Sequence, residues 1–97
     1  MAQPSINAAF YKLGASQDLA SGAASVQSAP FTAGCKAIRV SCTVACRFLI
    51  GANPTALATS PLLMPADAEY FAVEGAERIA VIQEAAGGKV SIVELQS

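Results

Sequence analysis

The stretch Lys36-Ala-Ile-Arg-Val-Ser-Cys-Thr43 decides the predicted fold, because its apolar and polar residues alternate. In an extended chain, successive side chains point to opposite faces. Ile38, Val40 and Cys42 therefore share one face, and the residues between them share the other. This pattern is typical of a strand that packs one face on a hydrophobic core.

Further runs of strand-forming residues flank this stretch, at spacings of roughly 8 to 12 residues and with turn residues between them. The predicted strands are residues 46–50, 69–73, 78–82 and 90–95, with weaker ones at 17–19 and 25–27 and at most an edge strand within 56–68. The short Gly-containing connection between 69–73 and 78–82 predicts a β-hairpin. No run is typical of a crossover helix, so a parallel α/β sheet is not expected. The predicted fold is all-β, a small antiparallel β-sandwich or jelly-roll-like barrel of about seven strands.

The N-terminal third differs from the rest of the chain, because it is rich in Ala, Ser, Gln and Gly and has few large side chains. We predict an extended N-terminal arm over residues 1–13 and a β-sandwich domain over residues 14–97. A helix over the first part of this region is the open alternative, since Ile6 and Phe10 are spaced to share a helical face. An arm with few core anchors is either disordered or laid on a neighbouring subunit.

Charged side chains are scarce, with 6 Lys and Arg and 7 Asp and Glu among 97 residues and a net charge of −1. They make up 13% of the chain, against about 25% in typical soluble domains. A chain without a basic surface is not expected to bind nucleic acid. No stretch predicts a membrane-spanning helix or an export signal. A surface this poor in charge is expected to be covered by protein partners, so we predict a homo-oligomer.

No residues predict catalysis or a cofactor, because the chain has no His to act as a base beside its three thiols. A structural zinc site needs four Cys or His ligands, usually in close pairs, and this chain has three Cys and no CxxC. We therefore expect no enzyme, no cofactor and no metal site.

Cys35, Cys42 and Cys46 are the candidate site residues, as candidates for disulfide bonding. Small buried thiols also behave as ordinary apolar side chains, and this reading stays open. If residues 43–45 form a three-residue hairpin loop, Cys42 and Cys46 lie opposite each other and can pair. Cys35 is then left over, and an odd thiol can pair between subunits under oxidising conditions.

Four stretches of the chain resemble a group of small structural proteins of tailed bacteriophages. These stretches are Cys46–Ala56, Leu62–Phe71, Val73–Ile82 and Val90–Leu95. The resemblance covers roughly residues 35–95, and the three cysteines are not part of its pattern. It implies a small β-sandwich of the virion, either a capsid decoration (cement) subunit or a neck or tail accessory subunit.

The resemblance also implies partners and a location. We expect a virion protein, made in the host cytoplasm, that contacts the major capsid protein or neighbouring virion proteins. Because capsids offer three-fold positions, a trimer is the leading expectation. The alternative from a different class is an adhesive module of the particle that binds a receptor or a glycan.

Overall fold

The computed structural model describes residues 12–65 and 68–96. Most of the predicted arm, residues 1–11, therefore lies outside the described residues. Within the described ranges the chain forms strands and no helix. The strands are β1 (Lys12–Ser21), β2 (Val26–Gln27), β3 (Ala37–Cys42), β4 (Cys46–Gly51), β5 (Leu62–Leu63), β6 (Glu69–Ala72), β7 (Arg78–Gln83) and β8 (Gly88–Gln96). The all-β class is confirmed, but the described strands number eight rather than about seven.

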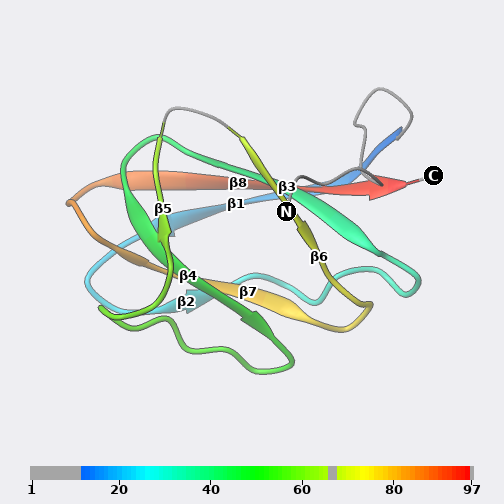
Figure 1. Ribbon diagram of the computed structural model, residues 1–97, viewed down its shortest axis with the longest axis horizontal. Helices are drawn as coiled ribbons and strands as arrows, with labels where there is room; N and C mark the ends of the chain where they lie inside the picture. Colours follow the sequence, from blue (N-terminus) through cyan, green and yellow to red (C-terminus); the bar gives the residue numbers. More distant parts are fainter. Residues whose placement is uncertain (1–11, 66–67, 97) are drawn as a thin grey trace.

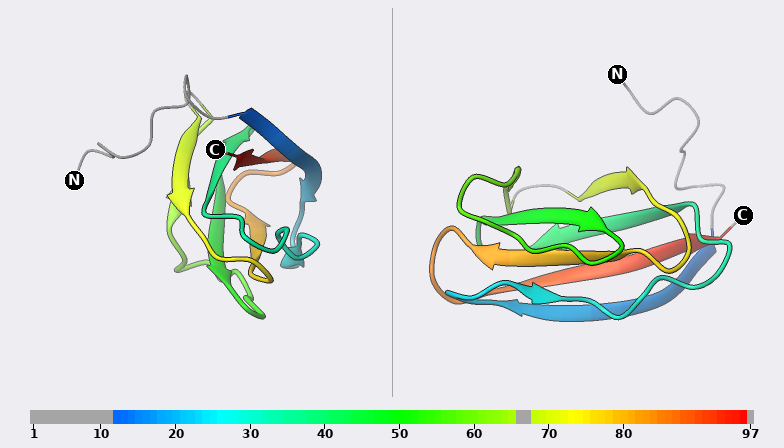
Figure 2. Two further views of the ribbon diagram at one scale, coloured as in Figure 1. Left: turned by 90° about the vertical axis from the view of Figure 1, so that its right-hand side faces the viewer. Right: turned by 90° about the horizontal axis from the view of Figure 1, so that it is seen from below.

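The strands form two antiparallel sheets of four, seen in Figures 1 and 2. One sheet, here sheet A, has the order β1-β8-β3-β6, and the other, sheet B, has the order β2-β7-β4-β5. The pairs β1–β8, β2–β7, β3–β6 and β4–β5 are all antiparallel neighbours, and β3–β8 and β4–β7 complete the sheets. Strands that are consecutive in the chain therefore occupy corresponding positions in the two sheets: β1 and β2, β8 and β7, β3 and β4, and β6 and β5.

The hydrophobic core draws on both sheets. Its members that are less than 2% exposed are Ile38 and Val40 of β3, Cys46 of β4, Leu63 of β5, Ile79 and Val81 of β7, and Val90 and Ile92 of β8. The buried residues of β3 and β8 alternate with outward-facing ones, as the period of two requires, whereas β1 adds only the partly buried Leu19. The predicted inward faces of residues 36–43 and 46–50 are thus confirmed, since Cys42 and Phe48 are buried and Ile50 packs against the core.

The predicted hairpin between residues 69–73 and 78–82 is wrong. Its two strands belong to different sheets: β6 pairs with β3, and β7 pairs with β4 and β2. The connection crosses from one sheet to the other, with Val73 buried in the core. The physical reason is the length and composition of the competing partner. Pairing β7 with β4 aligns two six-residue strands over their whole length, with apolar residues of both facing the core.

The N-terminal strands also differ from the prediction. Instead of a short weak strand at residues 17–19, β1 is ten residues long and begins inside the predicted arm, at Lys12. It pairs with β8 over nearly its whole length, with a register irregularity between Leu13 and Ser16. The long C-terminal strand gives this polar segment a backbone partner that its own side chains do not reveal. The weak strand expected at 25–27 is present as the two residues of β2.

The loop from β4 to β5, residues 52–61, lies against the outer face of sheet B. The backbone N–H of Ala56 donates to Ser25 Oγ at 2.9 Å, and Gln27 Nε2 of β2 donates to the carbonyl oxygen of Pro54 at 2.7 Å. Since β7 lies between β4 and β2, the loop must cross over β7 to make these bonds. Ala80, which faces outward on β7, is accordingly fully buried. The loop ends in β5, an edge strand as expected from the flanking prolines.

Candidate interaction surface and cysteine pair

Four exposed, large apolar side chains gather within residues 49–64, on and beside β4 and β5. They are Leu49 (41% exposed), Leu57 (57%), Leu62 (41%) and Met64 (52%). We call these four residues the β4–β5 surface. A fifth exposed leucine, Leu13, lies on β1.

The strand geometry explains why three of these side chains face the same way. Phe48 and Ile50 pack in or against the core, so Leu49 between them points outward. Leu63 is fully buried, so Leu62 and Met64 on either side of it also point outward. Arg47 is the cross-strand partner of Leu62, which makes Leu49 a diagonal neighbour of Leu62, roughly 7–8 Å away. The outward apolar residues of the two strands therefore lie on one face, around Arg47.

Arg47, which lies among these apolar residues, contacts two neighbouring segments of the chain. Its Nε lies 3.0 Å from Glu84 Oε1, and its Nη1 donates to the carbonyl oxygen of Ser60 at 3.1 Å. The first contact reaches toward the turn after β7, and the second holds the chain just before β5. An ion pair this exposed adds little stability, so its main effect is to orient the side chain across the surface.

The loop over sheet B covers only part of the outer face. Ala80 and Leu49 are cross-strand partners on this face, but Ala80 is fully buried while Leu49 is 41% exposed. The loop bonds to β2 and so passes over β7, leaving β4 and β5 outside its cover. Residues 48–50 and 80–82 are apolar on both faces of sheet B, and the loop covers the outward Ala80 but not the outward Leu49.

The cysteines lie in two separate places. Cys42 ends β3 in sheet A and Cys46 begins β4 in sheet B, so residues 43–45 cross between sheets. The predicted hairpin pairing of these two cysteines is wrong, because β3 pairs with β8 and β6 while β4 pairs with β7 and β5. Cys42 Sγ donates to the carbonyl oxygen of Leu63 at 3.7 Å, and Leu63 is the cross-strand partner of Cys46, so the two cysteines lie close together in the core. All three cysteines are buried as free thiols, and Cys35 donates a hydrogen bond to the carbonyl oxygen of Ala37 instead.

Burial suppresses the ionisation of these thiols. It raises the pKa of Cys46 from 9.0 to about 12, with the neighbouring Cys42 adding to the effect. Burial also raises the pKa of Cys42 and of Cys35; near Cys35 the carboxylate of Glu94 raises it further. The thiolate is the nucleophilic and metal-binding form of cysteine. In the folded chain these groups are therefore held in their least reactive form.

Glu94 is a buried carboxylate that the sequence analysis missed. It is 5% exposed, and its Oε2 accepts a hydrogen bond of 3.0 Å from the backbone N–H of Thr32. The signal was present in the sequence, since Val90, Ile92 and Glu94 share one face of the last strand. The carboxylate anchors the loop at residues 31–35 to β8, next to Cys35.

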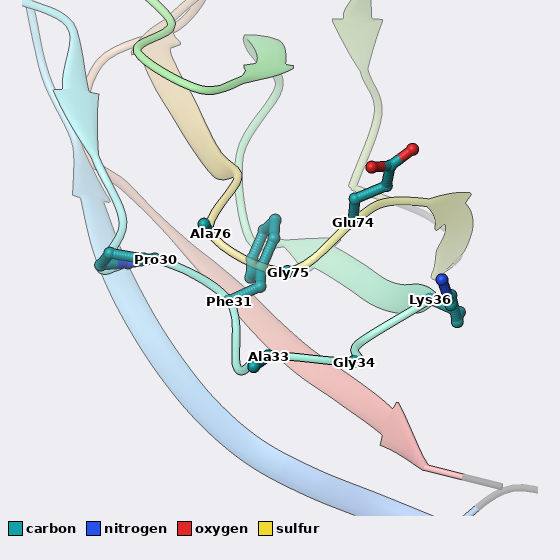
Figure 3. A pocket seen from close by; sticks show the side chains of 8 residues that line it. All are labelled: Pro30, Phe31, Ala33, Gly34, Lys36, Glu74, Gly75 and Ala76. Atoms are coloured by element: carbon teal, nitrogen blue, oxygen red, sulfur yellow. The ribbon is translucent and has the colours of Figure 1, made fainter.

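A shallow hollow of about 490 Å³ lies where residues 30–36 meet residues 74–76 (Figure 3). Gly75 allows the close approach of these two segments, because a Cβ there would lie 2.9 Å from Ala33 Cα. The ionisable side chains that line the hollow are Lys36 and Glu74, and both are exposed. A solvated amine and a solvated carboxylate do not form the enclosed acid–base pair that catalysis needs.

A second hollow, of about 360 Å³, lies on the outer face of sheet A. Ser91 of β8 pairs with Asp18 of β1 and with Ser41 of β3, which places three polar residues in one row across the sheet. Thr43 and Lys89 continue the lining, and the N–H of Lys89 donates to Thr43 Oγ1 at 2.9 Å. Hydroxyls, a carboxylate and an amine on an open face can hydrogen-bond a polar ligand.

Among the described residues, no group of three or more His, Cys, Asp or Glu side chains could hold a metal ion. None of the described elements is a helix long and apolar enough to cross a membrane. No protein-family model, no curated protein and no solved structure matches the chain.

Proposed function

We propose that this chain is a structural subunit of a virus particle, a decoration (cement) protein that stabilises a phage head through protein–protein contacts. In this proposal it is no enzyme and needs no cofactor. It assembles as a homo-oligomer, with a trimer as the leading expectation, on the major capsid protein or on neighbouring virion proteins. The two-sheet arrangement is, in the same proposal, a β-sandwich of the jelly-roll type.

The strand pairing supports the jelly-roll assignment. Folding one long hairpin of eight strands brings together the first and eighth, second and seventh, third and sixth, and fourth and fifth. These are four of the observed pairs. Jelly rolls are eight-stranded double sheets that occur in viral capsid proteins, in lectins and in other families. The link from this fold to a virion is an analogy, since a fold does not by itself imply a function.

The β4–β5 surface carries the functional part of the proposal. Leu49, Leu62 and Met64 face outward together beside an edge strand, and an apolar surface next to an open edge favours association with another protein. The scarcity of charge acts in the same direction, because it leaves little repulsion between copies. Many weak copies of one contact, arranged by symmetry on a shell, add up to a stable coat. The resemblance to phage structural proteins supports the same reading.

The test is binding of the purified full-length chain to empty phage heads. We expect the chain to elute well above 9.8 kDa and to sediment with the shells. Imaging of the decorated particles then distinguishes a head position from a neck or tail position. A chain that stays monomeric at high concentration and never sediments with the shells contradicts the proposal.

The polar hollow on sheet A favours the second candidate, an adhesive module that binds a glycan. Sugars are recognised by hydrogen bonds, and Asp18, Ser41 and Ser91 offer both donors and acceptors in one row. A glycan array separates the two candidates. Binding to an array that is lost in Asp18→Ala favours the adhesive module, and an array without signal together with shell binding favours decoration.

A further inference from the structure

The crossing from β3 to β4 is held rigidly at both sheets. On one side, the N–H of Thr43 donates to the carbonyl oxygen of Lys89 at 3.0 Å, and Thr43 Oγ1 accepts from Lys89 N–H. On the other side, the carbonyl oxygen of Ala45 accepts from the N–H of Glu84 at 3.2 Å. Thr43 and Ala45, the first and last residues of the connection, are thus bonded to β8 and to the turn after β7.

The apex of the crossing is also packed. A Cβ on Gly88 would lie 2.9 Å from Val44 Cβ, so Val44 lies directly against the Gly88 backbone. Only a glycine at position 88 permits this contact. At the two ends of the crossing, Cys42 Sγ lies 3.7 Å from the carbonyl oxygen of Leu63, and Leu63 is the cross-strand partner of Cys46, so the two cysteines lie close together in the core.

From this geometry we infer that Cys42 and Cys46 form an inter-sheet disulfide when the chain meets a small disulfide oxidant, such as oxidised glutathione. The bond joins the last residue of β3 in sheet A to the first residue of β4 in sheet B. Disulfides between the two sheets of a β-sandwich also occur in antibody domains. The inference does not depend on the proposed function.

The chemistry is thiol–disulfide exchange. One cysteine attacks oxidised glutathione as its thiolate, forms a mixed disulfide and releases one molecule of reduced glutathione. The second cysteine then attacks the mixed disulfide and releases another. The protein loses two protons and two electrons, and the glutathione disulfide bond takes them up to give two thiols.

The folded chain is expected to oxidise slowly, because burial holds both thiols protonated. The bond therefore forms during folding or during a transient opening of the end of the molecule. Cys35 lies beside Glu94 and away from the pair, so it should remain a free thiol.

The test is oxidation of the full-length chain in glutathione buffers, followed by unfolding in denaturant with alkylation of free thiols, trypsin digestion and mass spectrometry. Cleavage after Arg39 and Arg47 places Cys42 and Cys46 together in peptide 40–47, whereas Cys35 lies in peptide 13–36. We expect peptide 40–47 to become two hydrogens lighter and to take up no alkylating agent. Peptide 13–36 should be alkylated fully.

A second arm separates the effect of the fold from the nearness of the two cysteines in sequence. The same buffers are used with and without a denaturing concentration of urea. If the fold holds the thiols in place, the exchange equilibrium constant is at least about tenfold larger without urea. Cys46→Ser and Cys42→Ser should each leave the other thiol alkylated, and Cys35→Ser should change nothing.

Three results overturn the inference. Cys42 and Cys46 could both remain alkylated in oxidising buffer without urea. The equilibrium constant could be the same or smaller without urea than with it. Cys35 could be found joined to peptide 40–47.

Discussion

The edge strands of the two sheets lie on two sides of the molecule, β1 and β2 on one side and β5 and β6 on the other, and the two sides differ in their contacts. On the side formed by β1 and β2, Gln17 of β1 makes two hydrogen bonds to Ala29, the second residue after β2. Its Oε1 accepts from the N–H of Ala29 at 2.9 Å, and its Nε2 donates to the carbonyl oxygen at 3.2 Å. On the side formed by β5 and β6, the strand β5 has two residues, and its Leu62 and the following Met64 are exposed.

The difference shows what each side is suited for. A side-chain amide that pairs with a backbone N–H and carbonyl occupies groups that an incoming strand would need, so the β1–β2 side is protected from unwanted pairing. The β5–β6 side exposes apolar atoms to water, and burying them under a protein partner lowers the free energy. We therefore expect changes on the first side to affect folding and changes on the second side to affect association.

The largest expected effect lies in the core between the two sides and does not distinguish them. Cys46 is fully buried, and its pKa is about 12 in the folded chain against an ordinary value of 9.0. Between pH 9 and pH 12 the unfolded chain loses this proton and the folded chain keeps it. The free energy of unfolding should therefore be constant below pH 9 and fall above it, by up to about 4 kcal/mol at pH 12.

Urea unfolding at several pH values, with a reductant present, measures this effect. Other groups also titrate in this range, so the comparison is with Cys46→Ala. The difference in unfolding free energy between the two proteins should be steady below pH 9 and then move in favour of the variant. Parallel curves for the two proteins up to pH 12 would show that Cys46 ionises equally easily in both states.

The next effect should be confined to the β5–β6 side. The double substitution of Leu49→Asp and Leu62→Asp places two carboxylates on the β4–β5 surface and should weaken self-association at least about 100-fold, or about 3 kcal/mol. Because both leucines are exposed, the unfolding free energy of the monomer should change little. Sedimentation velocity over a concentration series measures the association.

Leu13→Asp is the matched control for this double variant, since Leu13 is the most exposed leucine and lies on β1. It should leave association unchanged. If Leu13→Asp dissociates the oligomer and the double variant does not, the association side has been assigned to the wrong end of the sheets.

The strands and their faces could be predicted from the sequence, because both follow from local alternation. In residues 36–43 the period of two gave the buried face of β3 correctly, and the prolines around Leu62 and Leu63 marked an edge strand. Pairing could not be predicted in the same way. The runs that became β6 and β7 are joined by a short Gly-containing connection that suits a hairpin, yet β7 has a better partner in β4, 27 or more residues earlier in the chain.

The candidate site was predictable only in part. That apolar runs such as residues 48–50 have a second, outward face was visible in the sequence. Which outward residues stay exposed depends on the path of the loop at residues 52–61, which covers Ala80 and not Leu49. The contact between Cys42 and Cys46 was expected for the wrong reason, since it arises from a crossing between sheets rather than from a hairpin.

A smaller effect is expected where the β1–β2 side meets β7. Ser28 is 2% exposed, and its Oγ accepts a hydrogen bond of 3.0 Å from the N–H of Ile79, which extends the pairing of β2 with β7. Ser28→Ala leaves that buried N–H without this acceptor and should lower the unfolding free energy by about 2 kcal/mol. Ser16→Ala, at an exposed position of β1, should change it by less than about 0.5 kcal/mol. Equal effects in urea unfolding would mean that Ser28 adds nothing to the ladder.

The smallest effect tests the link that closes the β1–β2 side. Gln17→Ala removes both hydrogen bonds to Ala29. The backbone groups of Ala29 lie near the surface and can bond to water instead, so the unfolding free energy should fall by only about 1 kcal/mol. Gln83→Ala, at a half-buried position of β7, is the matched control.

Association should be the same in both variants and in the parent chain. If Gln17→Ala instead raises the oligomer mass, the backbone groups of Ala29 pair with other copies once the amide is gone, and this result contradicts the assignment of the β1–β2 side to folding alone. Sedimentation velocity on dilute and concentrated samples separates that new edge pairing from the association through the β4–β5 surface, because only the latter is abolished by the Leu49 and Leu62 substitutions.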